Sequence, residues 1–350
     1  MVSASGGDAN PAVGGGNGGE RLVDIPLFDV EAPAAERLMT LAADRIDMLI
    51  SQGQRHYGRL VLAAGDRLTW AWLQRSGNPY LDEIARIRRR LGRPGAVLLN
   101  MSYEWSCTTA VVADAACGMR LLRTLDWPLT GLGRTVLVAR QRGAAGHYYS
   151  VTWPGFVGVL TGLAPGRFSA AINQPPLRRV TGLKPFDWVI ARVGLWRENG
   201  LPATHLLRRV FDTCRTYAEA RQMLIETPLC LPAFFTLAGI GPGEGCVIER
   251  RQRSAAVHEA PAVMSNHWVG FALQGHDRGH DSIRRRALMS GLAPDADETF
   301  SWLQPPILNP TTRLVATANA ATGALCVQGW ERHGPATRLF TLPRAGMLAA

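Results

Sequence analysis

The sequence predicts an α+β fold, in which helices cover the outer faces of antiparallel sheets, and three observations support this prediction. Residues 33–92 have the apolar periodicity of helices, and the chain after Asn100 changes to short β-rich runs separated by Gly and Pro. A helical stretch at 187–226 then separates the first group of strands from a second group. Strands, helices and strands again in this order are typical of α+β proteins and not of alternating α/β proteins.

Two helices are predicted in the first hundred residues, each from its apolar pattern and its end signals. The first follows Pro33, has apolar side chains every three or four residues, and is expected to stop at Gly53. The second begins at residues 78–79 and stops at Gly92. Residues 1–20 contain seven glycines and almost no bulky side chain, so they are expected to form a disordered leader.

The later elements are predicted from β-rich runs and shorter helical patterns. Thr216 and Glu219 form a capping box at the start of one helix, and a turn at 321–323 joins the last two strands in a hairpin. The predicted strands are 108–112, 120–125, 135–139, 156–160, 168–172, 233–238, 245–250, 262–265, 314–317 and 324–328. The predicted helices are 187–198, 204–211, 216–226, 282–289 and 297–303.

Composition indicates an ordinary globular chain, with 47% apolar and 19% charged residues. No apolar run approaches the roughly 20 residues that span a bilayer, and the N-terminus lacks the basic and apolar regions of a secretory signal. A soluble protein in the cytoplasm is therefore expected. The cysteines lack CxxC pairs and metal-ligand spacing, which predicts free thiols and no metal site. No cofactor is expected. They are Cys107, Cys117, Cys214, Cys230, Cys246 and Cys326.

The formal net charge of +10 comes almost entirely from arginine, because Lys184 is the only lysine. Arginine clusters at 86–93 and 284–286 both fall on predicted helices. No recognition helix, RNA-binding aromatic motif or zinc finger accompanies them. We therefore expect solvated basic faces and no nucleic-acid partner.

Cys107, Arg123 and Asp126 are the first candidates for a catalytic site. Their spacing suits a strand that leaves Cys107, turns at Gly118 and returns beside it. Isolated Cys, Arg and Asp residues are common, so these three alone favour a buried structural thiol and a structural ion pair on a hairpin. The residues around them change this interpretation.

Several segments in a fixed order carry a resemblance to a known family. One segment, 100–109, contains Cys107, and another, 123–127, contains Arg123 and Asp126. The others are 24–28, 150–162, 168–173, 231–235 and 243–250. Together they resemble the acid ceramidase and N-acylethanolamine acid amidase family, relatives of the choloylglycine hydrolases, over roughly residues 22 to 340.

This resemblance implies the four-layer αββα fold of N-terminal-nucleophile hydrolases and self-cleavage between Ser106 and Cys107. Residues 1–106, with the leader and a helical region at 21–106, would become an α fragment. Residues 107–350 would become a β fragment that carries the hydrolase fold. Lysosomal relatives join the two fragments by a disulfide, but residues 1–106 contain no cysteine, so packing alone must hold them together.

The resemblance makes Cys107 the nucleophile, with its own new α-amino group as the base. A free α-amino group has a pKa of about 7.7 to 8, so it is suited to take the thiol proton near neutral pH. Asp126 would hold this amino group. Arg123, which cannot lose its proton, would favour the thiolate and orient the substrate carbonyl.

An oxyanion donor and an arginine complete the implied catalytic set. Asn266 would donate its amide to the oxyanion, although a turn asparagine is an equally good interpretation of this residue by itself. One member of the row Arg284, Arg285 and Arg286 would also belong to the site, and we expect Arg284 or Arg285.

Three residues are expected to bind substrate. Asn173 ends a predicted strand where relatives carry a site-lining asparagine, and capping of the strand explains it equally well. Gln174 stands where ceramidases have an acid, which implies a different specificity. Trp153 belongs to an aromatic group, with Trp127, Tyr149 and Phe156, that is expected to be core with some members lining an acyl pocket.

Two conspicuous patterns are interpreted as structural. His267, His276 and His280 lie in a Gly/Asp-rich stretch without an HExxH arrangement, which favours a polar loop over a metal site. The glycine-rich segment 239–245 lacks a GKS or GKT ending and falls between two strands, so it is expected to be a tight connection.

We therefore expect an amidohydrolase that cleaves a linear N-acyl amide, such as an N-acyl lipid, through a Cys107 thioester and with transient membrane contact. One alternative is an acyltransferase or acylase of the same fold that acts on a β-lactam side chain, a bile-salt conjugate or a peptide amide. The other is a structural or binding homologue that does not cleave itself.

Overall fold

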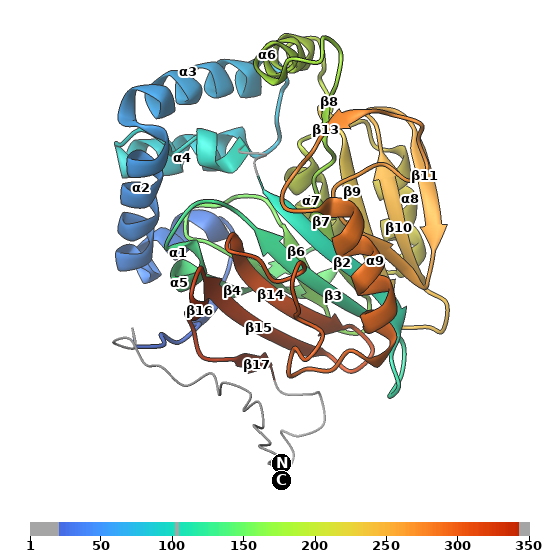
Figure 1. Cartoon of the computed structure of the whole chain (residues 1–350). Coiled ribbons are helices and arrows are strands. Elements are labelled where there is room, and N and C mark those ends of the chain that lie inside the picture. The colour runs from blue at the N-terminus through green and yellow to red at the C-terminus, as the bar shows by residue number, and fades with distance from the viewer. Residues whose placement is uncertain (1–20, 102–104, 343–350) are drawn as a thin grey trace, which may run out of the picture.

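The structure, a computed structural model, describes residues 21–101 and 105–342 and contains two stacked β-sheets (Figure 1). The first sheet has the strand order β1 (Leu27–Val30), β4 (Leu137–Gly143), β5 (Gly146–Thr152), β6 (Thr161–Ala164), β7 (Phe168–Asn173), β9 (Ala233–Gly239), β10 (Gly245–Arg250) and β11 (Ala255–Glu259). The second has the order β12 (Ala262–Met264), β2 (Ser106–Ala113), β3 (Met119–Asp126), β14 (Thr312–Asn319), β15 (Ala324–Glu331) and β16 (Gly334–Pro335), and β17 (Phe340–Leu342) also pairs with β15. A small third sheet pairs β8 (Leu177–Arg178) with β13 (Gly275–His276). The leader predicted at 1–20 lies outside the described residues.

The helices fall into three groups. Before Cys107 come α1 (Ala34–Leu41), α2 (Ala43–Tyr57), α3 (Arg59–Arg75), α4 (Leu81–Leu91) and the short 3-10 helix η1 (Leu98–Met101). Between the two groups of strands lie α6 (Lys184–Leu195), α7 (Ala203–Thr213) and α8 (Tyr217–Glu226). The others are α5 (Leu132–Thr135), α9 (Ser282–Leu292) and the 3-10 helix η2 (Ala293–Asp295).

Helices cover the outer face of each sheet, which gives four layers in the order αββα. Phe211 on α7 packs into a core against β7 and β10 of the first sheet. Met289 on α9 packs into a separate core against β2, β3 and β14 of the second sheet. The largest core lies between the two sheets and includes Leu125 and Val138. The predicted α+β class and four-layer arrangement are confirmed.

Strand alternation directs the Cys107 side chain into the space between the sheets. Along β2, Cys107 and Val111 belong to the core between the sheets, whereas Ala110 and Val112 belong to the core under α9. Thr109, on the same face as Cys107, reaches the opposite sheet, where its Oγ1 lies 2.7 Å from Thr236 Oγ1. A thiol at this position is therefore enclosed by both sheets.

The part of the chain before Cys107 is built into the rest of the fold. Strand β1 pairs in parallel with β4, so a strand from this part forms one edge of the first sheet. Glu83 on α4 and Arg208 on α7 form a buried ion pair, with 2.7 Å between Oε2 and Nη1. Glu83 Oε1 also accepts the backbone N–H of Ala35, and the Arg208 guanidinium lies 4.4 Å from the Tyr80 ring centroid.

Helices α3 and α6 lie next to each other at the top of Figure 1, and both carry exposed apolar side chains. The Trp72 indole N–H on α3 donates to the carbonyl of Leu195 on α6, at 3.0 Å. Within the described ranges, the structure has no helix with the length and apolar character that crossing a membrane requires.

Several predicted elements are wrong, each for a local reason. The first predicted helix is in fact two helices, α1 and α2, because the backbone leaves the helical conformation at Ala42, where φ is -129°. The second does not stop at Gly53 but continues to Tyr57, because the backbone breaks at Gly58, where φ is +83°. Residues 156–160 are irregular and not a strand. Residues 297–303 are not a helix, because the Asp297 carboxylate accepts the backbone N–H groups of Thr299 and Ser301 and so competes with helical hydrogen bonds. Helix α3 and strand β5 were not predicted.

Candidate active site

Cys107 is the second residue of β2 and is fully buried. Its backbone N–H donates to Asn266 Oδ1 at 3.0 Å, and its thiol lies 3.6 Å from the carbonyl oxygen of Ile172 on the facing sheet. Burial raises the pKa of the Cys107 thiol to about 11, although Arg123 opposes this rise. This environment therefore favours the neutral form of the thiol.

Arg123 lies on β3, opposite Thr109 of β2, and it is completely buried. One guanidinium N–H donates to the Cys107 sulfur at 3.4 Å, and another donates to the Ile172 carbonyl at 2.8 Å. The carbonyl thus fixes the cation beside the sulfur. A guanidinium in this position favours the thiolate over the thiol.

Asp126 ends β3 directly opposite Ser106, the residue before Cys107. Its two carboxylate oxygens accept hydrogen bonds at 2.9 Å, Oδ1 from the Thr312 hydroxyl and Oδ2 from the Asn309 amide. Burial raises the pKa of the Asp126 carboxyl, and the charge of Arg285, 3.7 Å away, opposes this rise. Asn309 and Thr312 were not predicted from the sequence.

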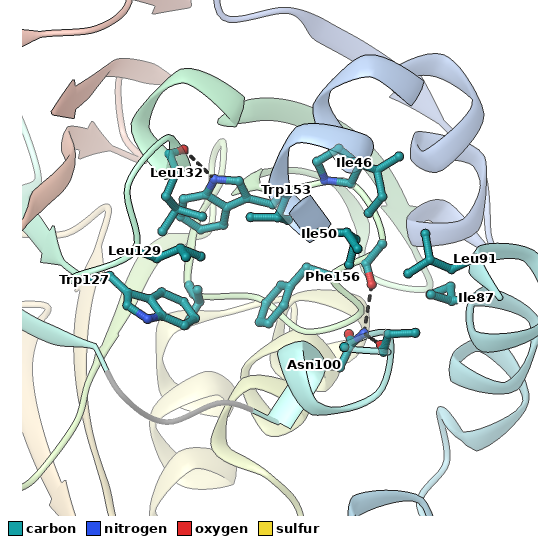
Figure 2. A pocket seen from close by; sticks show the side chains of 16 residues that line it. Ile46, Ile50, Ile87, Leu91, Asn100, Trp127, Leu129, Leu132, Trp153 and Phe156 are labelled. Atoms are coloured by element: carbon teal, nitrogen blue, oxygen red, sulfur yellow. Dashed lines mark hydrogen bonds between the residues drawn. The ribbon is translucent and has the colours of Figure 1, made fainter. Parts of the chain in front are cut away.

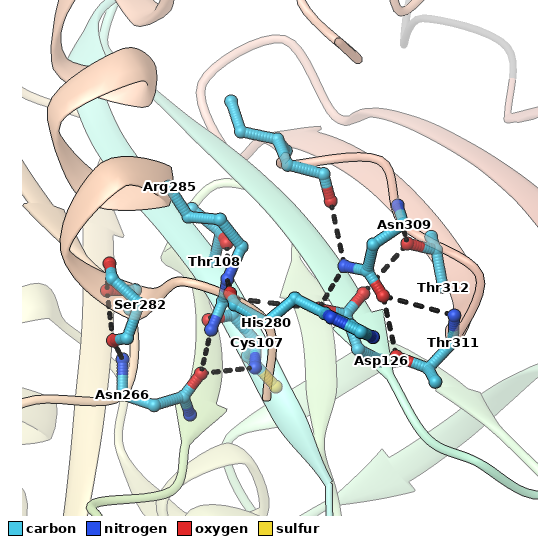
Figure 3. Close-up of polar contacts among 12 residues, drawn as sticks. Cys107, Thr108, Asp126, Asn266, His280, Ser282, Arg285, Asn309, Thr311 and Thr312 are labelled. Carbon is cyan, nitrogen blue, oxygen red and sulfur yellow. Dashed lines mark hydrogen bonds and ion pairs between the residues drawn. The ribbon is translucent and has the colours of Figure 1, made fainter. Parts of the chain in front are cut away.

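Arg285 connects the other members of the site (Figure 3). Its Nη1 donates to the Cys107 carbonyl at 2.7 Å and to the Thr108 hydroxyl at 2.8 Å. Its Nη2 donates to Asn266 Oδ1 at 2.8 Å. Because Asn266 Oδ1 also accepts a hydrogen bond from the Cys107 N–H, one amide oxygen binds both the arginine and the cysteine nitrogen.

Asn266 presents its oxygen to Cys107, and its amide nitrogen donates to the Gln174 carbonyl at 2.7 Å. Its backbone N–H donates to the Ser282 hydroxyl at the start of α9, which ties the turn after β12 to this helix. The structure thus has Asn266, and not Asp126, bonded to the cysteine nitrogen.

Only one of the two expected arginines lies in the site. Arg285 is completely buried, whereas Arg284 is exposed on the solvent side of α9. Consecutive residues of a helix point about 100° apart, so two neighbours cannot both face the sheet. Arg286, half-buried, donates to the Val263 carbonyl and not to the catalytic candidates.

Asn173 and Gln174 lie where β7 ends, beside Ile172. The Asn173 amide donates to the carbonyls of Met264 and Ser265, and its buried Oδ1 has no hydrogen-bond partner among the described residues. Gln174 is nearly buried and lines a large cavity. The structure therefore places both residues next to the Cys107 group.

The three histidines occupy different environments. His267 Nδ1 contacts the Ser282 hydroxyl at 2.8 Å, and His276 Nε2 contacts Asp187 Oδ2 at 2.7 Å. His280 lies near Asp126, and its carbonyl accepts the Arg285 Nε–H (Figure 3). In the part of the chain that the structure describes, no group of three or more His, Cys, Asp or Glu side chains could hold a metal ion.

A narrow pocket with apolar walls lies between the N-terminal helices and the residues after Asp126 (Figure 2). Trp127, Trp153 and Phe156 line it, whereas Tyr149 is not among its lining residues. Its volume is about 40 Å³, which leaves little free space. Trp105, just before the Ser106-Cys107 bond, packs against Trp127 with 5.6 Å between ring centroids.

A second cavity has a volume of about 650 Å³. Gln174 and Gly279 belong to its wall, and Gly279 lies so close to the Ser106 side chain that a Cβ atom would clash there. Helix α6 forms another part of the wall. A cavity of this size accommodates a small organic ligand.

The sequence is similar to those of known proteins, although no protein-family model matches it. The chain is 27% identical to the acid ceramidase of Heterocephalus glaber over 269 residues, which cover 68% of this chain and 66% of that protein. It is 29% identical to the N-acylethanolamine-hydrolyzing acid amidase of Caenorhabditis elegans over 192 residues, 52% of each protein. The chain thus spans half to two thirds of the length of these relatives.

A solved structure, that of a Caenorhabditis elegans N-acylethanolamine-hydrolyzing acid amidase ortholog, is similar to this chain with a TM-score of 0.50. Sequence identity is 23%, and the similarity covers 68% of this chain and 100% of that chain. The two proteins share a fold.

Proposed function

We propose that this chain is a self-cleaving amidohydrolase of linear N-acyl amides. The proposal starts from its membership in the family of the acid ceramidases and the N-acylethanolamine-hydrolyzing acid amidases. One observation carries the proposal. The thiol, backbone nitrogen and backbone carbonyl of Cys107 are each bonded by a different buried polar side chain, namely Arg123, Asn266 and Arg285. A structural cysteine does not need such an environment.

Self-cleavage would begin with attack of the Cys107 sulfur on the Ser106 carbonyl carbon. The carbon–sulfur bond forms, the Ser106-Cys107 carbon–nitrogen bond breaks, and the cysteine nitrogen takes up the thiol proton. Water then hydrolyses the thioester, which gives a Ser106 carboxylate, a free thiol and a free α-amino group. Asn266 Oδ1, which already accepts the N–H of this nitrogen, would orient the new amino group.

Turnover would use the same atoms. The α-amino group takes the thiol proton, and the thiolate, stabilised by Arg123, attacks the substrate amide carbon. The tetrahedral oxyanion collapses, the amine leaves with the proton, and water hydrolyses the acyl thioester to a carboxylic acid. We propose Asn266 as an oxyanion donor through its amide N–H, and Asp126 as the group that holds the ammonium form of the N-terminus.

The apolar pocket around Trp153 is the proposed site of the acyl chain, because its lining includes no charged residue. In the uncut chain, Trp105 packs on the wall of this pocket at Trp127. Cleavage after Ser106 would free the segment that carries Trp105 and so give the pocket room for an acyl chain.

The α and β fragments are proposed to remain one particle after cleavage. Strand β1 would stay in the sheet of the β fragment, and the buried Glu83–Arg208 pair would join α4 to α7. The apolar core between the sheets also contains residues of both fragments, such as Ile84 and Leu125, and separation of the fragments would expose this apolar surface to water.

Transient membrane contact is proposed through exposed apolar side chains of α6 and α3. On α6 these include Phe186 and Val193, with 62% and 55% of their surface exposed, and on α3 Leu60, with 87%. The variant Phe186→Ser/Val193→Ser should bind vesicles of phosphatidylcholine and phosphatidylserine at least about tenfold more weakly, because each lost side chain removes 1 kcal/mol or more of apolar burial.

Vesicle flotation measures this binding, and Leu339→Ser is the control because Leu339 is also an exposed apolar residue but lies outside both helices. Equal binding of the two variants and the unmodified protein would rule out this surface as the membrane contact.

The proposed activity is tested by incubating the mature protein with N-acyl amides of increasing chain length. We expect release of the carboxylic acid, and acid quenching during turnover should trap the acyl group on the peptide that begins with Cys107, as read by mass spectrometry. The fragments should elute together in native size-exclusion chromatography and separate on a denaturing gel without reductant. Hydrolysis with no acylated Cys107, or an active preparation that contains only uncut chain, would contradict the mechanism.

A further inference from the structure

A turn at residues 278–280 lies against the peptide bond that the chain is proposed to cut. It leads from β13 to the start of α9, and two of its residues, Arg278 and Gly279, line the large cavity. Gly279 has a φ of +68°, a left-handed backbone conformation that glycine adopts at little cost. The centre of the turn is therefore a position that favours glycine.

Gly279 packs directly on the side chain of Ser106, the residue before the proposed cut. A Cβ atom added to Gly279 would lie 2.5 Å from the Ser106 Cβ and closer still to the Ser106 Oγ. Carbon atoms in contact are normally about 3.5 to 4.0 Å apart, so the turn or Ser106 would have to move by about 1 Å. Ser106 has little freedom to move, because it is 5% exposed and lies opposite Asp126 in the pairing of β2 with β3.

The same turn also holds Arg285 (Figure 3). The His280 carbonyl accepts the Arg285 Nε–H at 2.5 Å, and the Arg278 carbonyl lies 3.4 Å from Arg285 Nη2. Arg285 Nη1 in turn donates to the Cys107 carbonyl at 2.7 Å. One turn thus contacts both residues of the bond, Ser106 directly through Gly279 and Cys107 through Arg285.

We infer that Gly279 is a positioning residue for self-cleavage, because its lack of a side chain lets one turn hold Ser106 and Arg285 where the reaction needs them. This inference rests on the proposed cut between Ser106 and Cys107. The sulfur can attack only when it lies about 3 to 3.5 Å from the Ser106 carbonyl carbon in the right direction, and a misplacement of about 1 Å costs about 100-fold in rate. A side chain at position 279 would cause a shift of that size.

Gly279→Ala should therefore slow self-cleavage about 100-fold. Gel time courses after cell-free synthesis measure the rate, and intact-mass spectrometry confirms the position of the cut. Gly243→Ala is the matched control, because Gly243 also has a positive φ, of +78°, but no atom lies within 4 Å of the position of an added Cβ. This control should cut itself at the rate of the unmodified protein.

A second substitution separates the contact with Ser106 from strain in the turn itself. Ser106→Gly removes both atoms that the added Cβ would meet, so in this background Gly279→Ala should lose most of its effect on the rate of self-cleavage. Strain from the φ of Gly279 is the same in both backgrounds and cancels in the comparison. The same four combinations made with Cys107→Ala cannot cut, and there Gly279→Ala should lower the melting temperature less when Ser106→Gly is present.

The outcomes separate this inference from the proposed function. If Gly279→Ala cut itself at the unmodified rate, or slowed the cut equally with and without Ser106→Gly, the inference would be overturned and self-cleavage would stand. A similar loss of rate in Gly243→Ala would also overturn it, because strain alone would then explain the effect. If Ser106→Gly alone were not cut, the melting temperatures would decide, and equal losses in both backgrounds would count against Gly279. An unmodified protein that stays uncut would contradict the proposed function itself.

Discussion

Cys107→Ala should remain a single uncut chain with no amide hydrolysis, a loss on the order of a million-fold as for removal of other enzyme nucleophiles. Alanine offers no group that can attack the Ser106 carbonyl or a substrate. Cys107→Ser retains a hydroxyl, whose much higher pKa makes it a poorer nucleophile, so this variant should cut itself slowly and keep trace activity. Intact-mass spectrometry and acid release from an N-acyl amide measure both effects.

Cys246→Ala is the matched control for this experiment. Cys246 is also fully buried and burial also raises the pKa of its thiol to about 11, but it lies in the core under α7 and α8, away from Asn266 and Arg285. Its loss should lower stability only. If Cys246→Ala abolished hydrolysis while the protein stayed folded, or if Cys107→Ala still turned over, the nucleophile would be misassigned.

Arg285→Lys should slow self-cleavage and turnover about 100-fold, the cost of misplacing reacting groups by about 1 Å. Lysine keeps the charge beside Asp126, so the buried carboxylate retains a cation. A single ammonium cannot reproduce the planar set of bonds that Arg285 makes to the carbonyl of Cys107, the hydroxyl of Thr108 and the amide oxygen of Asn266. The cysteine and its oxyanion candidate would lose their common anchor.

The adjacent Arg284→Lys provides the comparison, because it makes the same chemical change on the exposed side of the same helix. This variant should cleave itself and turn over like the unmodified protein. Rates are measured by gel time courses after synthesis and by steady-state kinetics on mature protein, with circular dichroism as the check on folding. Similar losses in both variants would remove the special role of Arg285.

Local sequence patterns could predict the hairpin that brings Cys107 and Arg123 together, because a short antiparallel connection fixes which residues lie opposite each other. They could not predict Asn309 as a partner of Asp126. These two residues are 183 positions apart, and the Asn-Pro-Thr-Thr sequence at 309–312 indicates a turn and nothing about what its side chains contact.

The choice between Arg284 and Arg285 was also beyond sequence reasoning, because it depends on how α9 is rotated on the sheet. That rotation is set by the packing of Met289 and by the hydrogen bond between Ser282 and Asn266, which are tertiary contacts. The irregular stretch at 156–160 was misjudged because its apolar residues are buried without forming a strand: Phe156 and Leu160 line a pocket, and Val157 and Val159 pack in two cores. A pattern of apolar residues indicates which side chains are buried, and side chains can be buried outside strands as well.

Because β1 pairs with β4, the residues before Cys107 must be present while the first sheet assembles. A β fragment made alone would expose the β4 edge, a row of unpaired backbone groups that can recruit strands from other molecules. Residues 27–30 cover that edge only if they are present while the sheet assembles. If the chain cuts itself as proposed, folding must precede the cut, and a gene split at codon 107 should produce a protein prone to aggregation unless both halves are synthesised together.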